Sequence, residues 1–215
     1  MIPREEPRRR LKIGPNTIFS LSIAKRFFLN GWRKSICRQL KYGQWPRHPA
    51  CDPVCLFPTA EAAEAAGAEI YAALPPIANR EEIFGAQRLV DEEDREYGRP
   101  EKLLSNATAI SIDDAPALAA RYGGFCYPAH IDRDSMSVLS ALGEIPPYLG
   151  FCTVEVADPE RFFAGGKNAG YAEAYHLLTC SDAHRTEALL PDASHALHLP
   201  ACSFAALKAA LTTPK

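Results

Sequence analysis

The stretch LLTCSDAH, residues 177–184, places a carboxylate and an imidazole two positions apart, just where an apolar run ends. In extended backbone, residues i and i+2 point to the same side, so Asp182 and His184 can reach one point in space. A carboxylate and a neutral imidazole directed at one point suit a divalent metal ion. The alternative is an aspartate that caps a helix, followed by an ordinary surface histidine.

Two other apolar segments also end in polar side chains that could join such a site. GFCYPAH ends at His130, and GFCTVEVAD carries Glu155. In folds of alternating strands and helices, the functional site gathers at the carboxyl ends of the parallel strands. We therefore expect His130 to approach the Asp182–His184 pair. Glu155 is expected to be structural or to support the ligands.

The strands that would position these residues are short and apolar, and turn residues bound them. The sequence predicts strands at 54–58, 124–130, 150–158 and 175–184, and a final one at 195–200. Helical patterns separate them at 59–74, 80–94, 112–124, 134–143 and 203–211. This alternation indicates an α/β fold with a largely parallel sheet or barrel.

Local signals mark where several of these helices begin. Thr59, Ser111 and Ser203 are suited to N-cap positions, and Asn79 with Glu82 three residues later resembles a capping box. Before residue 50 the periodicity is weak, although residues 16–40 could form one amphipathic helix that Gly31 would weaken.

The composition of the chain changes near residue 50. Of its 24 Lys/Arg and 26 Asp/Glu residues, 12 and 2 lie in residues 1–50, a net charge of +10, and 12 and 24 follow, a net of −12. Alanine is rare before this point and abundant after it. The break predicts a basic N-terminal segment, residues 1–53, followed by an α/β domain, residues 54–215.

The totals also exclude some classes of protein. No apolar run is long enough to span a bilayer, and the basic start does not resemble a secretory signal. The seven cysteines are odd in number and scattered, which favours reduced thiols in a cytoplasmic protein. Cys51 and Cys55 could contribute to a zinc site, but no second pair completes four ligands, so buried or incidental thiols are the better interpretation.

Several stretches, in this order, resemble one bacterial branch of the polymerase and histidinol phosphatase (PHP) family. They are CLFPT, PPIANREEIFGAQRLVDEED, LLSNAT, GGFCYPAHIDR, GFCTVEV and LLTCSDAH, and together they cover roughly residues 54–210. The resemblance implies a distorted (β/α)7 barrel, of which this chain would hold the C-terminal part. It also implies a metal-dependent phosphoesterase in which a metal-bound hydroxide attacks a phosphate ester.

The resemblance assigns roles to three residues. His130 resembles a metal-ligand histidine, and Asp182 and His184 resemble the closing catalytic pair that binds metal at the mouth of the barrel. The implied cofactors are divalent zinc, manganese or iron. The implied partner is a small phosphate ester or a nucleotide, with no membrane and no nucleic acid.

The chain departs from the family pattern in its first part. The early His-x-His strand and the other early ligands are missing, and His48 is the single histidine before His130. Asp52 stands where the related branch has a ligand histidine. We therefore expect a truncated, catalytically impaired domain whose residues 1–53 lie outside the family fold and arise from a frameshift or altered start. Missing strands would leave exposed sheet edges through which the chain could self-associate.

Two other functions stay open from the sequence. The first is a non-catalytic remnant or interaction module. The second, weaker one is a nucleic-acid-associated protein that uses the basic N-terminus, including Arg8, Arg9 and Arg10. A solvated basic tail is the simpler interpretation of those arginines.

Overall fold

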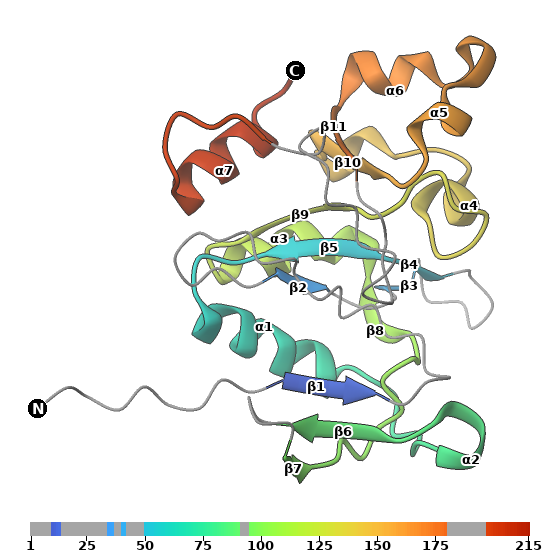
Figure 1. Cartoon of the computed structure of the whole chain (residues 1–215), viewed down its shortest axis with the longest axis vertical. Coiled ribbons are helices and arrows are strands. Elements are labelled where there is room, and N and C mark those ends of the chain that lie inside the picture. The colour runs from blue at the N-terminus through green and yellow to red at the C-terminus, as the bar shows by residue number, and fades with distance from the viewer. Residues whose placement is uncertain (1–9, 14–33, 37–39, 42–49, 91–94, 180–196) are drawn as a thin grey trace, which may run out of the picture.

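The described strands belong to four small sheets. The computed structural model describes residues 10–13, 34–36, 40–41, 50–90, 95–179 and 197–215. Strand orders are β1-β6-β7, β2-β5-β9, β4-β3-β8 and β10-β11. Figure 1 shows them in three tiers, with β10 and β11 at the top, β5 in the middle, and β6 and β7 at the bottom.

The central sheet consists of β2 (Lys34–Ile36), β5 (Pro53–Leu56) and β9 (Phe125–Pro128), and both of its pairings are antiparallel. Pro53 pairs with Pro128, and Leu56 pairs with Phe125. Because side chains alternate between the two faces of a strand, β5 directs Cys55 to one face and Val54 to the other. Each face is covered by apolar groups, which explains why the run around VCLFP is continuously apolar.

Helices α1 (Ala60–Ala72) and α3 (Ala115–Arg121) cover the first face of this sheet. The buried side chains of α1 are Ala63, Ala66 and Ile70, and they pack with Phe57 and Leu118. Small alanines let the helices approach the sheet closely. Thr59 caps α1 through its hydroxyl, which accepts from the Ala62 N–H at 3.2 Å. Ser111 likewise caps the short 3-10 helix Ile112–Asp114 that leads into α3.

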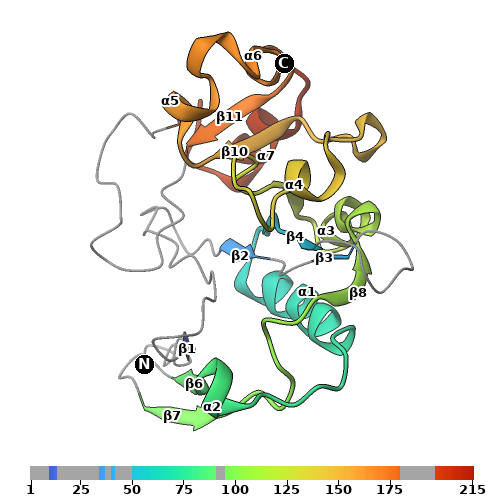
Figure 2. The ribbon, with the colours of Figure 1, turned by 90° about the vertical axis from the view of Figure 1, so that its right-hand side faces the viewer.

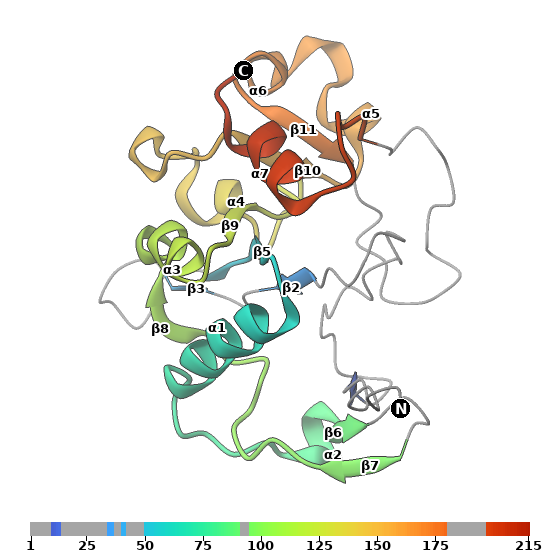
Figure 3. The same cartoon turned by 90° about the vertical axis from the view of Figure 1, so that its left-hand side faces the viewer.

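Helix α7 (Phe204–Thr212) covers the opposite face, as Figure 3 shows. Its Leu211 is buried in one cluster with Val54, Phe125 and Tyr127. The rings of Phe204 and Phe125 lie 5.8 Å apart between centroids. The Ser203 hydroxyl caps this helix, as the sequence predicts, by accepting from the Ala206 N–H.

The upper tier contains the parallel pair β10 (Thr153–Val156) and β11 (His176–Thr179), seen clearly in Figure 2. Its core consists of Ile131, Val138, Ile145, Val154 and Val156. The surrounding helices are α4 (Val138–Leu142), α5 (Pro159–Phe162) and α6 (Ala169–Ala174), with 3-10 turns at Pro147–Leu149 and Ala164–Gly166.

The lower tier and a small middle sheet contain the remaining strands. These are β1 (Arg10–Ile13), β3 (Leu40–Lys41), β4 (Ala50–Cys51), β6 (Gln87–Val90), β7 (Glu96–Gly98) and β8 (Thr108–Ser111), with the short helix α2 at Glu81–Phe84. Strand β1 pairs with β6, β2 with β5, and β3 with β8. Strands β1, β2 and β3 of residues 1–53 therefore hydrogen-bond to later strands, whereas β4 pairs with β3.

The expected α/β class is confirmed, whereas the largely parallel arrangement is wrong for the described strands. Among them only β10–β11 and β3–β8 pair in parallel, and no closed barrel forms. For the central pair, the absence of a Cβ at Gly124 permits the antiparallel arrangement of β5 and β9. The backbone at Gly124 passes so close to the Leu56 carbonyl and the Phe57 ring that a Cβ would clash. Strand β9 therefore starts beside the end of β5 and runs back along it.

Four other expectations are also wrong. The helix predicted at 80–94 is limited to α2, because Gly85 leaves helical geometry at φ 76° and β6 follows. Asn79 caps no helix and instead donates from Nδ2 to the Gly85 carbonyl at 2.8 Å. Residues 34–36, within the predicted 16–40 helix, form β2, and residues 197–200 form no strand.

A lysine side chain holds the C-terminal end of α1 in place. Lys102 Nζ donates to the carbonyls of Tyr71, Ala72 and Leu74, which stabilises the C-terminal end of α1.

No helix in the described ranges is long and apolar enough to cross a membrane.

Candidate metal centre

His130 lies two residues beyond the end of β9 and is buried, with 7% of its surface exposed. Its backbone has φ 28°, in the positive region that a residue with a side chain rarely adopts. The preceding Ala129 N–H donates to the Asp52 carbonyl at 2.8 Å, and the following Ile131 N–H donates to the Glu155 carbonyl at 2.8 Å. The backbone around His130 is thus held on one side by the start of β5 and on the other by β10.

The structure pairs the ring of His130 with the carboxylate of Asp52. Asp52 precedes β5, and its own N–H donates to the Met136 carbonyl at 2.9 Å. Its Oδ2 lies 3.9 Å from His130 Nε2. That separation is too long for a hydrogen bond, so the two groups face one another without direct bonding.

The other ring nitrogen of His130 has an unmet hydrogen-bonding capacity. Nδ1 is buried and has no hydrogen-bond partner among the described residues. Buried polar atoms are nearly always bonded, so an imidazole with one buried, unpartnered nitrogen is unusual. The sequence singles out His130, and the structure adds Asp52 beside it.

Glu155 is a buried member of β10, with 4% of its surface exposed. Val154 and Val156 face the upper core, so Glu155 shares the other face of the strand with Thr153. The Thr153 hydroxyl donates to the Leu211 carbonyl at 2.6 Å. That Glu155 is structural or supports the ligands stays a prediction.

Asp132 is a polar residue that the sequence reasoning missed. Its carboxylate accepts the backbone N–H groups of Ala157 and Asp158, both at 2.8 Å. Arg161 donates to the Asp132 carbonyl at 3.2 Å. The segment after His130 is thereby fastened to the exit of β10. The available signal was an aspartate two positions after His130 in the same motif.

Asp182 and His184 lie outside the described residues. The described residues stop at Thr179, the last residue of β11, and resume at residue 197; the parallel partner of Thr179 is Val156 at the end of β10. Because β10 and β11 are parallel, their carboxyl ends lie at the same edge, beside the Glu155 carbonyl that bonds to Ile131. Thr179, at the carboxyl end of β11, therefore lies at the edge of the sheet where the Glu155 carbonyl bonds to Ile131, the residue after His130.

The thiol next to Asp52 is chemically inert at neutral pH. Burial, with smaller contributions from the negative charges of Asp52 and Asp113, raises the pKa of Cys51 to about 12. Cys51 therefore remains protonated and makes a poor ligand or nucleophile.

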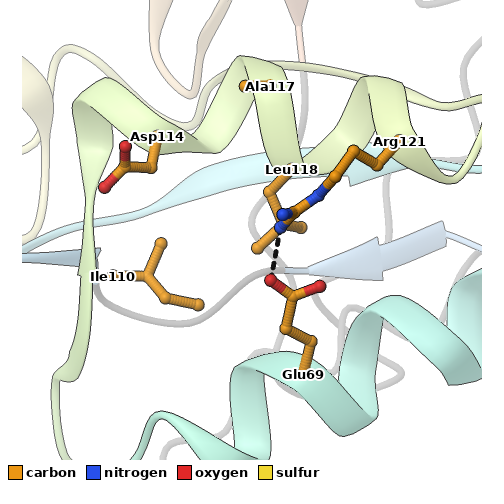
Figure 4. A pocket seen from close by; sticks show the side chains of 6 residues that line it. All are labelled: Glu69, Ile110, Asp114, Ala117, Leu118 and Arg121. Carbon is orange, nitrogen blue, oxygen red and sulfur yellow. Dashed lines mark hydrogen bonds and ion pairs between the residues drawn. The ribbon is translucent and has the colours of Figure 1, made fainter.

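Two other histidines and a pocket between α1 and α3 do not contribute to this site. His176 Nε2 bonds to the Thr213 carbonyl at 2.9 Å, and His198 is exposed. A pocket of about 230 Å³ lies between α1 and α3, where Glu69 and Arg121 form an ion pair (Figure 4). Arg121 already pairs with Glu69 there, Asp114 adds a second carboxylate to the lining, and the lining residues belong to elements other than those that hold His130.

The described residues contain no group of three or more His, Cys, Asp and Glu side chains that could hold a metal ion. They contribute two candidate donors, His130 and Asp52. Comparisons with protein-family models, with curated proteins and with solved structures find no match to this chain.

Proposed function

We propose that residues 54–215 form the C-terminal part of a PHP-type domain that hydrolyses phosphate esters with a divalent metal ion. The observation that carries the proposal is the approach of Asp52 to the buried ring of His130 at 3.9 Å. The two residues are far apart in the sequence, and the antiparallel pairing of β5 with β9 brings them together. Asp182 and His184 are the remaining donors of the proposal.

The donor set fits a metal ion. Two donor atoms that each lie about 2.1 Å from a shared tetrahedral cation are about 3.4 Å apart, so the side chains of His130 and Asp52 would move about 0.5 Å closer than the observed 3.9 Å on binding the ion. Imidazole nitrogen and carboxylate oxygen suit zinc, manganese and iron. Burial of the His130 ring keeps bulk water away from Nε2, the nitrogen that faces Asp52.

Each residue has a definite part in this proposal. Neutral His130 and His184, together with ionised Asp52 and Asp182, would hold the ion, which would lower the pKa of a bound water molecule and offset phosphate charge. Asp132 would keep His130 in place by fastening the next turn to Ala157 and Asp158. Asp52 would also favour an orientation of the imidazole with Nε2 toward the ion.

The test is hydrolysis of an aryl phosphate by the full chain with added Mn²⁺. Asp182→Ala and His130→Ala should each lower kcat/KM at least about tenfold, because even outer groups at metal sites often have effects of that size. The control is His198→Ala, which changes an exposed histidine and should leave the rate unchanged. Turnover that survives both ligand variants would refute the proposal.

A second candidate is a non-catalytic remnant or interaction module. The sequence favours it through one observation, the presence of a single histidine before His130, where the family has several early ligands. It predicts no Mn²⁺-dependent turnover and no change in metal binding on Asp182→Ala. Equilibrium dialysis with Mn²⁺ distinguishes it from the enzyme.

A further inference from the structure

Two cysteines face each other across the central sheet. Cys55 of β5 is the register partner of Cys126 of β9, and both carry thiols in the structure. Both point to the face covered by α1 and α3, because Cys126 packs against the cluster that contains Cys55. Figure 1 shows β5 and β9 side by side.

The hydrogen-bond pattern places this pair at the closer kind of position in an antiparallel ladder. The Ala129 N–H donates to the carbonyl of Asp52, the residue opposite Ala129, so Asp52 and Ala129 form a hydrogen-bonded pair. Such pairs alternate along the ladder, which makes Val54 and Tyr127 hydrogen-bonded and Cys55 and Cys126 non-hydrogen-bonded. Facing Cα atoms at such a pair lie about 4.5 Å apart, within the range that a disulfide spans.

We infer that Cys55 and Cys126 form a redox-active thiol pair, which a hydroperoxide converts into a disulfide between β5 and β9. This is a covalent modification site on the sheet that holds Asp52 and His130. It does not depend on the phosphoesterase proposal.

The chemistry assigns different steps to the two thiols. Cys126 is partly exposed, so its thiolate attacks the peroxide, forms an S–O bond and releases hydroxide or alkoxide. Cys55 is fully buried and resolves the sulfenic acid: its sulfur bonds to Cys126 sulfur, and water leaves. The two thiols are oxidised by two electrons, and the peroxide is reduced by two. Cys51 lies on β4, where its register partner is Leu40, so it does not face Cys126 across a ladder.

The experiment treats the folded full chain with hydrogen peroxide, blocks the remaining thiols and maps the cross-links by mass spectrometry. Trypsin leaves Cys51 and Cys55 on one peptide, so acid cleavage at the Asp52–Pro53 bond is added to separate them. The expected product joins residues 53–80 to residues 122–133 and has lost two hydrogen atoms. Its yield should exceed that from urea-unfolded chain at least about tenfold, because the fold holds the sulfurs within reach.

Variants make the outcome decisive. Cys126→Ala changes a partly exposed residue and should abolish this product, as should Cys55→Ala, whereas Cys152→Ala and Cys202→Ala should retain it. Over-oxidation of Cys126 to sulfinic acid without the cross-link would overturn the inference. So would equal yields from folded and unfolded chain, or cross-links that involve only the other cysteines.

Discussion

At the scale of single residues, the burial of Cys51 makes the free energy of unfolding depend on pH in the alkaline range. Its pKa rises from an ordinary value near 9 to about 12 in the folded chain. Above pH 9 the unfolded chain loses this proton and the folded chain keeps it. The unfolded state therefore binds fewer protons, and the free energy of unfolding falls by about 1.4 kcal/mol per pH unit until pH 12.

This slope is measurable by urea unfolding at several pH values between about 9 and about 12. Lysines and tyrosines also titrate there, so the informative quantity is the difference from a Cys51→Ala variant, in which this contribution is absent. Below pH 9 the difference between the two proteins should be constant. Parallel curves for both proteins up to pH 12 would show that the Cys51 thiol ionises normally.

Residue-level prediction succeeded where the interaction is local. Thr59, Ser111 and Ser203 are the predicted caps, and each bonds to an N–H two or three residues ahead. The pairing of Asp52 with His130 was not predictable in this way, because it depends on how two distant strands align. His130 itself was recognised as a candidate from its position at the end of an apolar segment.

At the scale of elements, α7 is the cover of one face of the central sheet. Leu211 is 3% exposed and packs against Val54, Phe125 and Tyr127. Leu211→Ala should lower the free energy of unfolding by about 2–4 kcal/mol, because it removes buried methyl groups and leaves a cavity.

The matched control is Leu197→Ala, since Leu197 is 38% exposed. That change should stay within about 0.5 kcal/mol. Urea unfolding followed by circular dichroism gives both values. Equal effects from the two substitutions would mean that α7 is not docked on the sheet in solution.

Helices and strands were predicted correctly where the spacing of apolar residues agrees with the residues that mark the ends of the element. Helices α1, α3, α4 and α7 and strands β5, β9, β10 and β11 all begin within a few residues of the predicted bounds. The segment 80–94 was misread because its charged residues fit a helical pattern, whereas Gln87 turns inward. There its side chain bonds to the Lys102 carbonyl and the Leu104 N–H. The relative direction of neighbouring strands was also unpredictable, because the alternation of strands and helices does not show at which end of the sheet the next strand begins.

At the scale of the whole molecule, the apolar clusters are concentrated around β5, β9 and β10. None of the four clusters among the described residues includes a residue of β6 or β7. Ile83 and Tyr97, on α2 and β7, are about half exposed at 50% and 48%. The lower tier is therefore held to the rest mainly by polar contacts, among them those of Lys102 with the end of α1.

Stability should accordingly be uneven, since regions with few buried apolar contacts open locally before the molecule unfolds. In hydrogen–deuterium exchange, peptides that span β6 and β7 should exchange at least about tenfold faster than those of β5 and β9. Lys102→Met should accelerate exchange in the lower tier further, because it removes hydrogen bonds to two carbonyls of α1 and to the Leu74 carbonyl just beyond it, while keeping an apolar stem of similar length. Exchange in β5 and β9 should not change in that variant. Equal protection of both tiers, or equal acceleration by Lys102→Met, would instead mean that the molecule unfolds as a single cooperative unit.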